Sequence, residues 1–530
     1  VSTFAANIDA NANINANGNI IGDNSTNISG IASVTATSLY GDGSAITNLP
    51  AAGGVVSGVA TGSITIGKPV ALTTSGQFAQ VTGSTDLFGT PGVFANSATG
   101  DGSIVYDTLN DQYIIAYSRS TNITYAKTGS ISGTTITWGS EHVVNNSGST
   151  ENVRAVWDDY DNKLLVIYTR STDNSKLFMT VVDVNGTTFT NGTEVNCSGG
   201  DDGRRNCLLH VPGTSKVVVM MQDGSNYTRS SVGTITAGTN AVSFGSHQLI
   251  STGKSWDKSM CWHAGESKVV VAYQDYDNGE WGTVLAGSVS GTTMTWGSEQ
   301  TFNAKKTNST AVVYDSGNNA VIIGWTSGQS PYYPYVTAAT LSGTTFSFGQ
   351  TLELKGLSGS LAAGESMTGQ YSPNAGKTFL SWFTSSTSPH TLVSTVITLT
   401  GSALSQTAVH TINESSMATS LYPNSCYNPD DKVVALNYRD ETGTVEGEYY
   451  VQRIGESNVT SMNFLGFSQA AYTDGQTAKV DVIGAVNASQ SGLTTASDYF
   501  ILKDGTISAT DDGNTVKGGL AMSGTEILIR

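Results

Sequence analysis

The chain has 530 residues, and its 42 acidic and 25 basic side chains give a formal net charge of −17. Nucleic-acid binding depends largely on neutralising phosphates with Lys and Arg, so this balance argues against a nucleic-acid partner. The 60 glycines, with 13% charged and 38% hydrophobic residues, indicate a turn-rich all-β protein of two or three domains. The sequence has no apolar run of membrane-spanning length and no secretory signal, so membrane insertion is not expected. A start at Val1 without Met indicates a processed product or a fragment.

Residues 1–50 differ from the rest of the chain in composition. They are rich in Asn, Ala, Gly and Ser, with an Ile or Val every few positions. A single copy has too little apolar side-chain area here to offset the loss of chain entropy. The segment is therefore either disordered or wound with other copies into a thin fibrous β-structure. The fibrous interpretation predicts an N-terminal oligomerisation stalk and a homotrimer, in which three copies share one narrow core.

The middle of the chain is built on one short strand that occurs seven times, at intervals of roughly 51 to 57 residues. Each copy is β-branched and apolar, as expected of a strand that is buried on both faces. The copies cover residues 112–117, 163–168, 216–221, 268–273, 320–325, 377–382 and 432–437.

Each copy belongs to a larger unit of four strands. A strand and an Asp, Asn or Gly turn precede it, and a third strand and a Ser-Gly-Thr-Thr hairpin follow it. Seven such units predict a seven-bladed β-propeller over residues 95–462. The first and the last unit each hold four strands of their own, so we expect the ring to close by packing without exchanging a strand.

The flanking residues 51–94 and 463–530 show the alternating apolar pattern of half-buried strands. Each piece alone is short for an independent core. Because chain ends tend to lie close together, we expect the two pieces to pair into one small β-domain. The propeller would then be an insertion into that domain.

Four stretches and the propeller unit resemble parts of a known group of proteins. The sequence Leu-Tyr-Gly-Asp-Gly-Ser-Ala-Ile-Thr-Asn-Leu-Pro at residues 39–50 resembles an element of fibre and other virion structural proteins of tailed bacteriophages, especially marine ones. Residues 466–480, 491–500 and 518–529 resemble a module that ends many such proteins, and the propeller unit is similar to repeats in the same group. The resemblance implies an extracellular protein on the phage particle surface, among other virion proteins, and it identifies no catalytic residue.

One rim of the propeller is expected to carry the binding site. The loops between second and third strands share this rim with the connections between blades, and the repeats differ most there, so we call it the variable rim. Aromatic rings and hydrogen-bonding groups suit a binding surface for sugars. The candidates are Arg204, Arg205, Tyr227, Trp256, Trp281, Tyr332, Tyr333 and Tyr335. Alternatively, the aromatic side chains cover blade edges or contact a neighbouring subunit.

No catalytic residue, metal site or cofactor is predicted. Trp138 and Trp296 end a motif that invites comparison with the Asp-box of sialidases, but its Asp is missing in every repeat. The oxygen-rich residues 158–162 and 275–278 lack the spacing and the closing Glu of a calcium loop, which favours turns capped by their own side chains. Cys197 and Cys207 flank one loop and either form a disulfide or remain buried thiols.

The favoured hypothesis is a non-enzymatic phage fibre or appendage subunit whose propeller head binds a glycan or protein receptor on the host cell surface. One alternative is a purely structural virion protein that packs against capsid or tail neighbours. Another is a secreted glycan-active enzyme.

Overall fold

The computed structural model describes residues 54–530 except 85, 98, 120–122, 200–202, 204, 330–331, 355–366, 385–390, 414–422, 441–445 and 512–515. The predicted stalk, residues 1–50, and the candidate Arg204 therefore lie outside the described residues. The chain divides into two units, Val1–Ala52 and Gly53–Arg530. Within the described ranges the second unit is all β apart from the short 3-10 helix η2 (Ser171–Asp173), and it contains no helix of membrane-spanning length and apolarity.

The strands between residues 87 and 453 pair into seven antiparallel units, counted over the described residues, and each unit has an inner, a second, a third and an outer strand. Unit 1 is β6 (Thr99–Asp107), β7 (Gln112–Arg119), β8 (Thr124–Ser132) and the two-part outer strand β9 (Thr135–Trp138) and β10 (His142–Asn145). Unit 2 is β11 (Thr150–Asp158), β12 (Lys163–Arg170), β13 (Lys176–Asn185), β14 (Thr188–Asn191) and β15 (Val195–Asn196). Unit 3 is β16 (Cys207–Val211), β17 (Lys216–Gln222), β18 (Tyr227–Ile235), β19 (Val242–Phe244) and the first half of β20 (Gln248–His263).

Two long strands link units 3, 4 and 5, because β20 and β24 each run from one outer strand into the next inner strand. Unit 4 is the second half of β20, β21 (Lys268–Asp275), β22 (Trp281–Ser290), β23 (Thr293–Trp296) and the first half of β24 (Gln300–Asp315). Unit 5 is the rest of β24, β25 (Ala320–Ser327), β26 (Pro334–Ser342) and β27 (Thr345–Glu353). Unit 6 is β28 (Met367–Ser372), β29 (Lys377–Thr384), β30 (Thr391–Thr400), β31 (Ala403–Gln406) and β32 (His410–Asn413).

The repeated apolar strand of the sequence is the second strand of each unit. Its residues are buried on both faces, as Ile114, Val166 and Val270 illustrate, because one face packs on the preceding unit and the other on the following unit. The repeated Ser-Gly-Thr-Thr sequence forms the hairpin between the third and the outer strand. Gly133 there has φ of 63°, a left-handed conformation that glycine adopts without strain.

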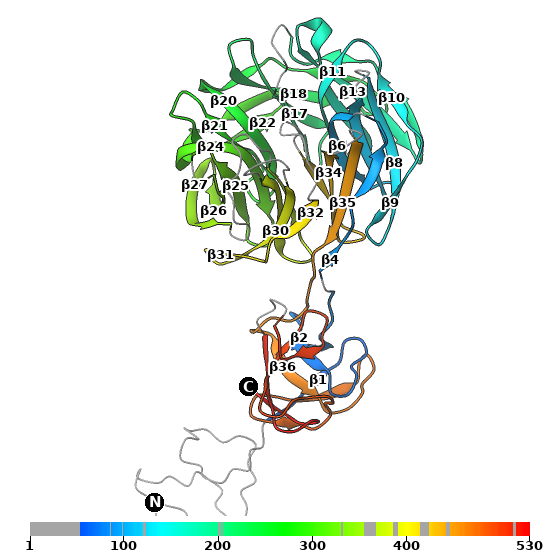
Figure 1. The fold of residues 1–530 in the computed structure, drawn as a ribbon, viewed down its shortest axis with the longest axis vertical. Helices are drawn as coiled ribbons and strands as arrows, with labels where there is room; N and C mark the ends of the chain where they lie inside the picture. Colours follow the sequence, from blue (N-terminus) through cyan, green and yellow to red (C-terminus); the bar gives the residue numbers. More distant parts are fainter. Residues whose placement is uncertain are drawn as a thin grey trace, which may run out of the picture. The chain divides into compact units, whose positions relative to one another are not determined.

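The units follow one another around a ring, in colour order from blue to orange (Figure 1). Their inner strands contact one another in sequence, β6 with β11, β11 with β16, β16 with β20, β20 with β24 and β24 with β28. The cycle ends with contacts from β28 to β33 (Asn424–Asn428) and from β33 back to β6. The fold is therefore a β-propeller.

The ring does not close by packing alone, and that prediction is wrong. Unit 7 takes β33, β34 (Val433–Asp440) and β35 (Glu446–Arg453) from the end of the propeller sequence, but its outer strand is β4 (Leu87–Phe88) and β5 (Gly92–Ala95). Val93 pairs with Glu448 across this junction. The exchange gives the edge of β35 hydrogen-bond partners that the last unit itself does not supply. The propeller sequence therefore begins before residue 95.

The remaining strands form two five-stranded antiparallel sheets. In the first, two C-terminal strands lie between N-terminal ones, in the order β1 (Val55–Val59), β37 (Thr477–Asp481), β36 (Phe464–Ser468), β2 (Pro69–Leu72), β3 (Phe78–Gln80). The second has the order β38 (Val486–Asn487), β42 (Ile527–Ile529), β41 (Val516–Ala521), β39 (Asp498–Ile501), β40 (Ile507–Ser508). Phe467, Ile501 and Ile527 are buried in one apolar cluster that draws on both sheets.

Candidate functional site

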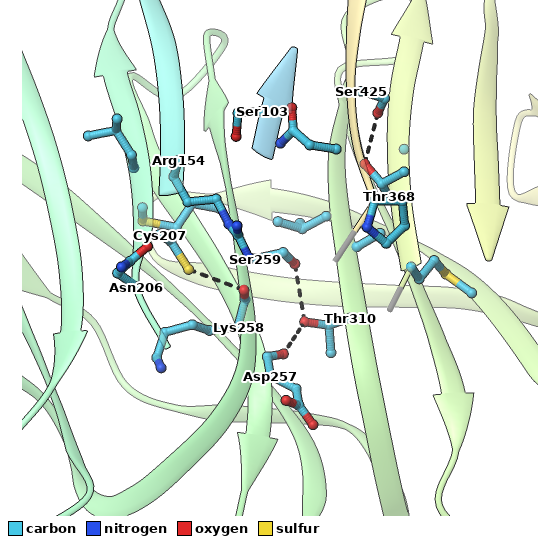
Figure 2. Close-up of a pocket in the computed structure, with 18 of the residues that line it drawn as sticks. Ser103, Arg154, Asn206, Cys207, Asp257, Lys258, Ser259, Thr310, Thr368 and Ser425 are labelled. Atoms are coloured by element: carbon cyan, nitrogen blue, oxygen red, sulfur yellow. Dashed lines mark hydrogen bonds between the residues drawn. The ribbon is translucent and has the colours of Figure 1, made fainter. Parts of the chain in front are cut away.

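A pocket of about 210 Å³ lies where the inner strands of all seven units converge. Figure 2 shows side chains from several of these strands facing one another across it. The pocket is lined by residues in the first part of each inner strand, near the connections between units. It therefore lies toward the variable rim.

The strand register places one residue of each inner strand at the same level of the pocket. Each of these residues pairs with the fifth residue of the repeated strand, as Arg154 pairs with Ile167 and Ser259 with Ala272. We call this ring the collar; all its members line the pocket, and they are Ser103, Arg154, Cys207, Ser259, Ala311, Thr368 and Ser425. Six members are small, and Arg154 alone is long and charged.

A second ring consists of residues with left-handed backbone. Asn152 (φ 52°), Arg205 (φ 49°), Asp257 (φ 46°) and Ser309 (φ 37°) each precede a collar residue by two positions in units 2 to 5, and all four line the pocket. The pairing register shifts at this place in β11, β20 and β24, which marks β-bulges. Bulges redirect side chains and are frequent beside functional sites. Asn and Asp tolerate this conformation, whereas it is uncommon for Arg and Ser, so backbone strain is expected at Arg205 and Ser309.

The pocket is cationic although the chain is acidic. Its described charged lining residues are Arg154, Arg205, Lys258 and Asp257, three basic groups and one acidic group. Lys258 Nζ donates a hydrogen bond to the Arg205 carbonyl oxygen at 2.9 Å, and Arg154 Nη1 donates one to the Val153 carbonyl oxygen at 2.8 Å. Burial lowers the pKa of Lys258 to about 8, and the charge of Arg205 acts in the same direction.

Two of the predicted binding residues meet beside this pocket. The guanidinium carbon of Arg205 lies 4.3 Å from the ring centroid of Trp256, whose ring in turn lies 4.6 Å from that of Tyr276. Arg205 lines the pocket and is exposed, whereas Trp256 is half-buried. Together Arg205, Trp256 and Tyr276 form an aromatic and cationic surface, which we call the platform.

The other predicted residues lie elsewhere on the variable rim and do not line the pocket. Tyr227 begins β18 and Trp281 begins β22. Tyr332 packs against the apolar cluster shared by units 5 and 6, and Tyr335 stacks on Trp325 with ring centroids 5.7 Å apart. Tyr333 accepts a hydrogen bond from the Ser327 amide through its carbonyl oxygen, at 2.9 Å.

A Tyr–Glu contact recurs in three units and was not predicted from the sequence. The hydroxyl of Tyr168 donates to Glu194 at 2.9 Å, and that of Tyr273 donates to Glu299 at 2.6 Å, while Tyr117 and Glu141 form the same contact in unit 1. The signal was present, because a Tyr ends the repeated strand and a Glu follows the Gly-Ser or Gly-Thr pair of the outer strand. The contact holds the outer strand to the second strand within one unit.

Neither Arg154 nor the small members of the collar were predicted from the sequence to line a pocket. The collar is invisible in the sequence because Ser, Thr, Ala and Cys are ordinary strand residues. A signal was available in the interval of 52 or 53 residues between the left-handed positions Asn152, Arg205, Asp257 and Ser309.

The oxygen-rich turn at Asp158 is capped by its own side chain, as predicted. Asp158 Oδ1 accepts hydrogen bonds from the amides of Tyr160 (2.9 Å) and Asp161 (3.1 Å). His210 joins this turn, with Nε2 2.9 Å from Asp158 Oδ1 and Nδ1 3.2 Å from Asp159 Oδ1. These three side chains are close enough to hold a cation. The ion pairs of His210 with Asp158 and Asp159 already explain why these three side chains lie close together.

Cys197 and Cys207 are free thiols, which decides between the two predicted alternatives. Cys197 Sγ donates to the Leu177 carbonyl oxygen at 3.3 Å, and Cys207 Sγ donates to that of Lys258 at 3.2 Å. Burial raises the pKa of both thiols. Buried thiols of raised pKa are poor nucleophiles.

Comparison with known proteins identifies the fold. No protein-family model matches the chain, and no curated protein matches its sequence. Among solved structures, the BP39L lectin from Burkholderia pseudomallei aligns with a TM-score of 0.51 at 10% identity, over 68% of this chain and 98% of the lectin. AofleA from Arthrobotrys oligospora aligns with a TM-score of 0.39 at 10% identity, over 67% and 96% of the two chains. Aleuria aurantia lectin, described as a six-bladed β-propeller, aligns with a TM-score of 0.36 at 13% identity, over 59% and 95%.

Proposed function

We propose that this protein is a non-enzymatic carbohydrate-binding protein, and that its seven-bladed propeller binds a glycan on the variable rim. The observation that carries the proposal is that the platform lies beside the pocket at the axis of the ring, which we call the axial pocket. A sugar ring can stack on Trp256 and Tyr276 while its hydroxyl groups reach the pocket. The likeness to the BP39L lectin supports the fold on which this site is built.

The pocket offers the mixture of donors and acceptors that sugar hydroxyl groups require. Thr368 and Ser425 hydroxyls lie 2.8 Å apart, and Gln370 Nε2 donates to the Ser425 carbonyl oxygen at 2.6 Å. Asn152 adds an amide from unit 2. Because these groups come from different inner strands of a closed ring, their positions are set before a ligand arrives, which lowers the entropic cost of binding.

The chemistry of the pocket favours binding over hydrolysis. Most glycosidases use two carboxyl groups that flank the scissile bond. Of the described residues that line this pocket, Asp257 alone has a carboxyl group. A single carboxylate beside three cations suits the orientation of a ligand better than acid and base catalysis.

We further propose that the protein is a trimeric fibre or appendage subunit of a phage particle, with residues 1–50 as the stalk. This part rests on the resemblance of residues 39–50 and of the C-terminal stretches to phage virion proteins. A glycan-binding propeller on such a subunit would contact the host cell surface. Sedimentation of the full chain should then give three times the monomer mass, and a purely monomeric chain would contradict the trimer.

A glycan array tests the binding function directly. The full chain, labelled with a fluorophore, should bind a restricted set of glycans, and the double variant Arg205→Ala, Trp256→Ala should lose that binding. The matched control is Trp157→Ala, because Trp157 lies at the other end of an inner strand, where its Nε1 donates to Thr108 Oγ1 at 3.1 Å. Binding that survives in the double variant, or no binding to any glycan, would overturn the proposal.

A further inference from the structure

We propose that the axial pocket binds the carboxylate of an acidic sugar residue, with Arg154 as the group that anchors it. This inference rests on the proposed function, because it names the class of sugar that the same site selects. The ligand is a uronic acid or a related monoanionic sugar at an end or a branch of a glycan. Neutral sugars would lack the group that the pocket is built to hold.

The composition of the collar leaves open space beside Arg154. Seven residues in equivalent register surround the axis, and six of them have short side chains. Arg154 therefore extends into space that its six counterparts leave open, as Figure 2 shows for Arg154, Ser103 and Ser259. A planar guanidinium group matches the two oxygens of a carboxylate, which gives the contact direction as well as strength.

Positive charge is concentrated in the pocket. Arg205 and Lys258 line the same pocket, so three cationic groups gather there although the whole chain has a net charge of −17. Such a concentration is unfavourable unless an anion or nearby acids offset it, because the like charges repel in a partly buried site. Asp101 offsets part of the Arg154 charge, and burial raises the pKa of Asp101.

The charged groups and the size of the pocket favour a monoanion over a dianion. Asp257 lines the pocket on the side of Lys258, so a dianion such as phosphate would meet a carboxylate as well as the cations. A monoanionic carboxylate needs fewer cations and suffers less of this repulsion. The volume of about 210 Å³ is below the roughly 300 to 1,000 Å³ of pockets for drug-sized ligands. It therefore suits one sugar residue.

The experiment compares matched ligands and matched variants by titration calorimetry at pH 7. The ligands are glucuronic acid, its neutral methyl ester, glucose and inorganic sulfate. We expect the acid to bind more tightly than the ester and glucose. Arg154→Gln should weaken acid binding about 10- to 100-fold, the loss expected for hydrogen bonds to a charged group, and should change ester binding little. Arg154→Lys should restore part of the affinity.

The control variant is Arg229→Gln, because Arg229 is paired with Asp223 at 3.0 Å in unit 3 and does not line the pocket. It should leave acid binding unchanged. If Arg154→Gln does not fold, Lys258→Gln provides a second variant that removes another pocket cation and should also weaken acid binding more than ester binding. The thermal midpoint of each variant shows whether it folds.

The outcomes separate this inference from the proposed function. Equal binding of the acid and its ester, unaffected by Arg154→Gln, would overturn the inference and leave glycan binding intact. Absence of binding to every sugar would overturn both. Sulfate that binds as tightly as the acid would show a site for free anions, and the assignment to an acidic sugar would be wrong.

Discussion

The guanidinium group of Arg205 stacks on the indole of Trp256, 4.3 Å from guanidinium carbon to ring centroid, although 51 residues separate the two in the chain. The contact joins the start of the unit 3 inner strand to the unit 4 inner strand. Arg205 has a left-handed backbone, with φ of 49°. A cation over an indole face is favourable, and it also holds the arginine at the mouth of the pocket.

Removing the indole should reduce glycan binding. Trp256→Ala deletes the stacking surface and releases Arg205, so the binding free energy should fall by about 2 kcal/mol or more. Tyr276→Ala should cost less, because Tyr276 packs on Trp256 and does not line the pocket. Calorimetric titration with the strongest ligand of the array measures both effects. Unchanged affinity in Trp256→Ala would place the site elsewhere on the rim.

The Lys258 ammonium group makes folding stability depend on pH in the alkaline range. Burial first, and then the charge of Arg205, lowers its pKa to about 8, against the opposing effects of Cys207 and Asp257. A lowered lysine pKa destabilises the folded state fully below about pH 8, and this penalty fades as the pH rises toward the unfolded value of about 10.4. Lys258→Met removes the penalty.

Thermal unfolding of the wild type and Lys258→Met between pH 7 and 10 tests this expectation. The thermal midpoint of the variant should exceed that of the wild type most near pH 7. The difference between the two midpoints should shrink as the pH rises. Affinity for an acidic sugar should fall in the wild type as the pH rises through about 8, since Lys258 loses its charge. A difference in midpoint that is constant over this range would show that Lys258 does not titrate there.

The contact of His210 with Asp158 should stabilise the junction of units 2 and 3 in mildly acidic solution. Burial lowers the pKa of His210, but hydrogen bonding to Asp158 and the charges of Asp158 and Asp159 outweigh it, so the pKa is raised above 6.5. Burial raises the pKa of Asp158, and the hydrogen bonds from His210 and the turn amides outweigh it, so that pKa lies below 3.8.

The sign of each shift sets the pH window. The raised histidine pKa contributes stability that is complete below pH 6.5 and is lost as the pH rises through the folded value. The lowered aspartate pKa contributes stability above pH 3.8 that is lost as the pH falls. His210→Gln should therefore lower the thermal midpoint most between about pH 4 and 6.5. His142→Gln, in the outer strand of unit 1, is the control because His142 contacts Asn191 and Phe189, neither of which carries a carboxylate. An equal, pH-independent effect of the two changes would refute the assignment.

The outer strand of unit 7 should control the stability of the whole ring. Phe94 in β5 is 5% exposed and packs edge-on against Tyr117 of unit 1, with ring centroids 5.1 Å apart. Phe94→Ala should cost about 3 to 5 kcal/mol of unfolding free energy, as for other buried aromatic truncations. Val93→Ala is the matched control, because Val93 is the neighbouring residue and is 39% exposed. Urea denaturation measures both, and equal losses would mean that β5 does not close the ring.

The sequence predicted the local elements of this protein well. The repeated strands, their hairpins and the self-capped turn at Asp158 are specified by short-range patterns, namely β-branched runs, left-handed glycines and side chains that accept hydrogen bonds from nearby amides. Arg205 and Trp256 were among the candidates because the variable rim could be located from the strand order. The seven phased copies also indicated a ring of similar units before any contact between them was known.

Only the tertiary structure decided how the ring closes and what lines its axis. The outer strand of unit 7 comes from residues 87–95, hundreds of residues from its partner β35, because an unpaired edge gains hydrogen bonds from any strand of matching shape and no local pattern reveals which one. The collar is equally hidden, since its members are ordinary strand residues until the register aligns them. Arg154 becomes a pocket residue only because six small side chains, each from a different unit, leave it the space.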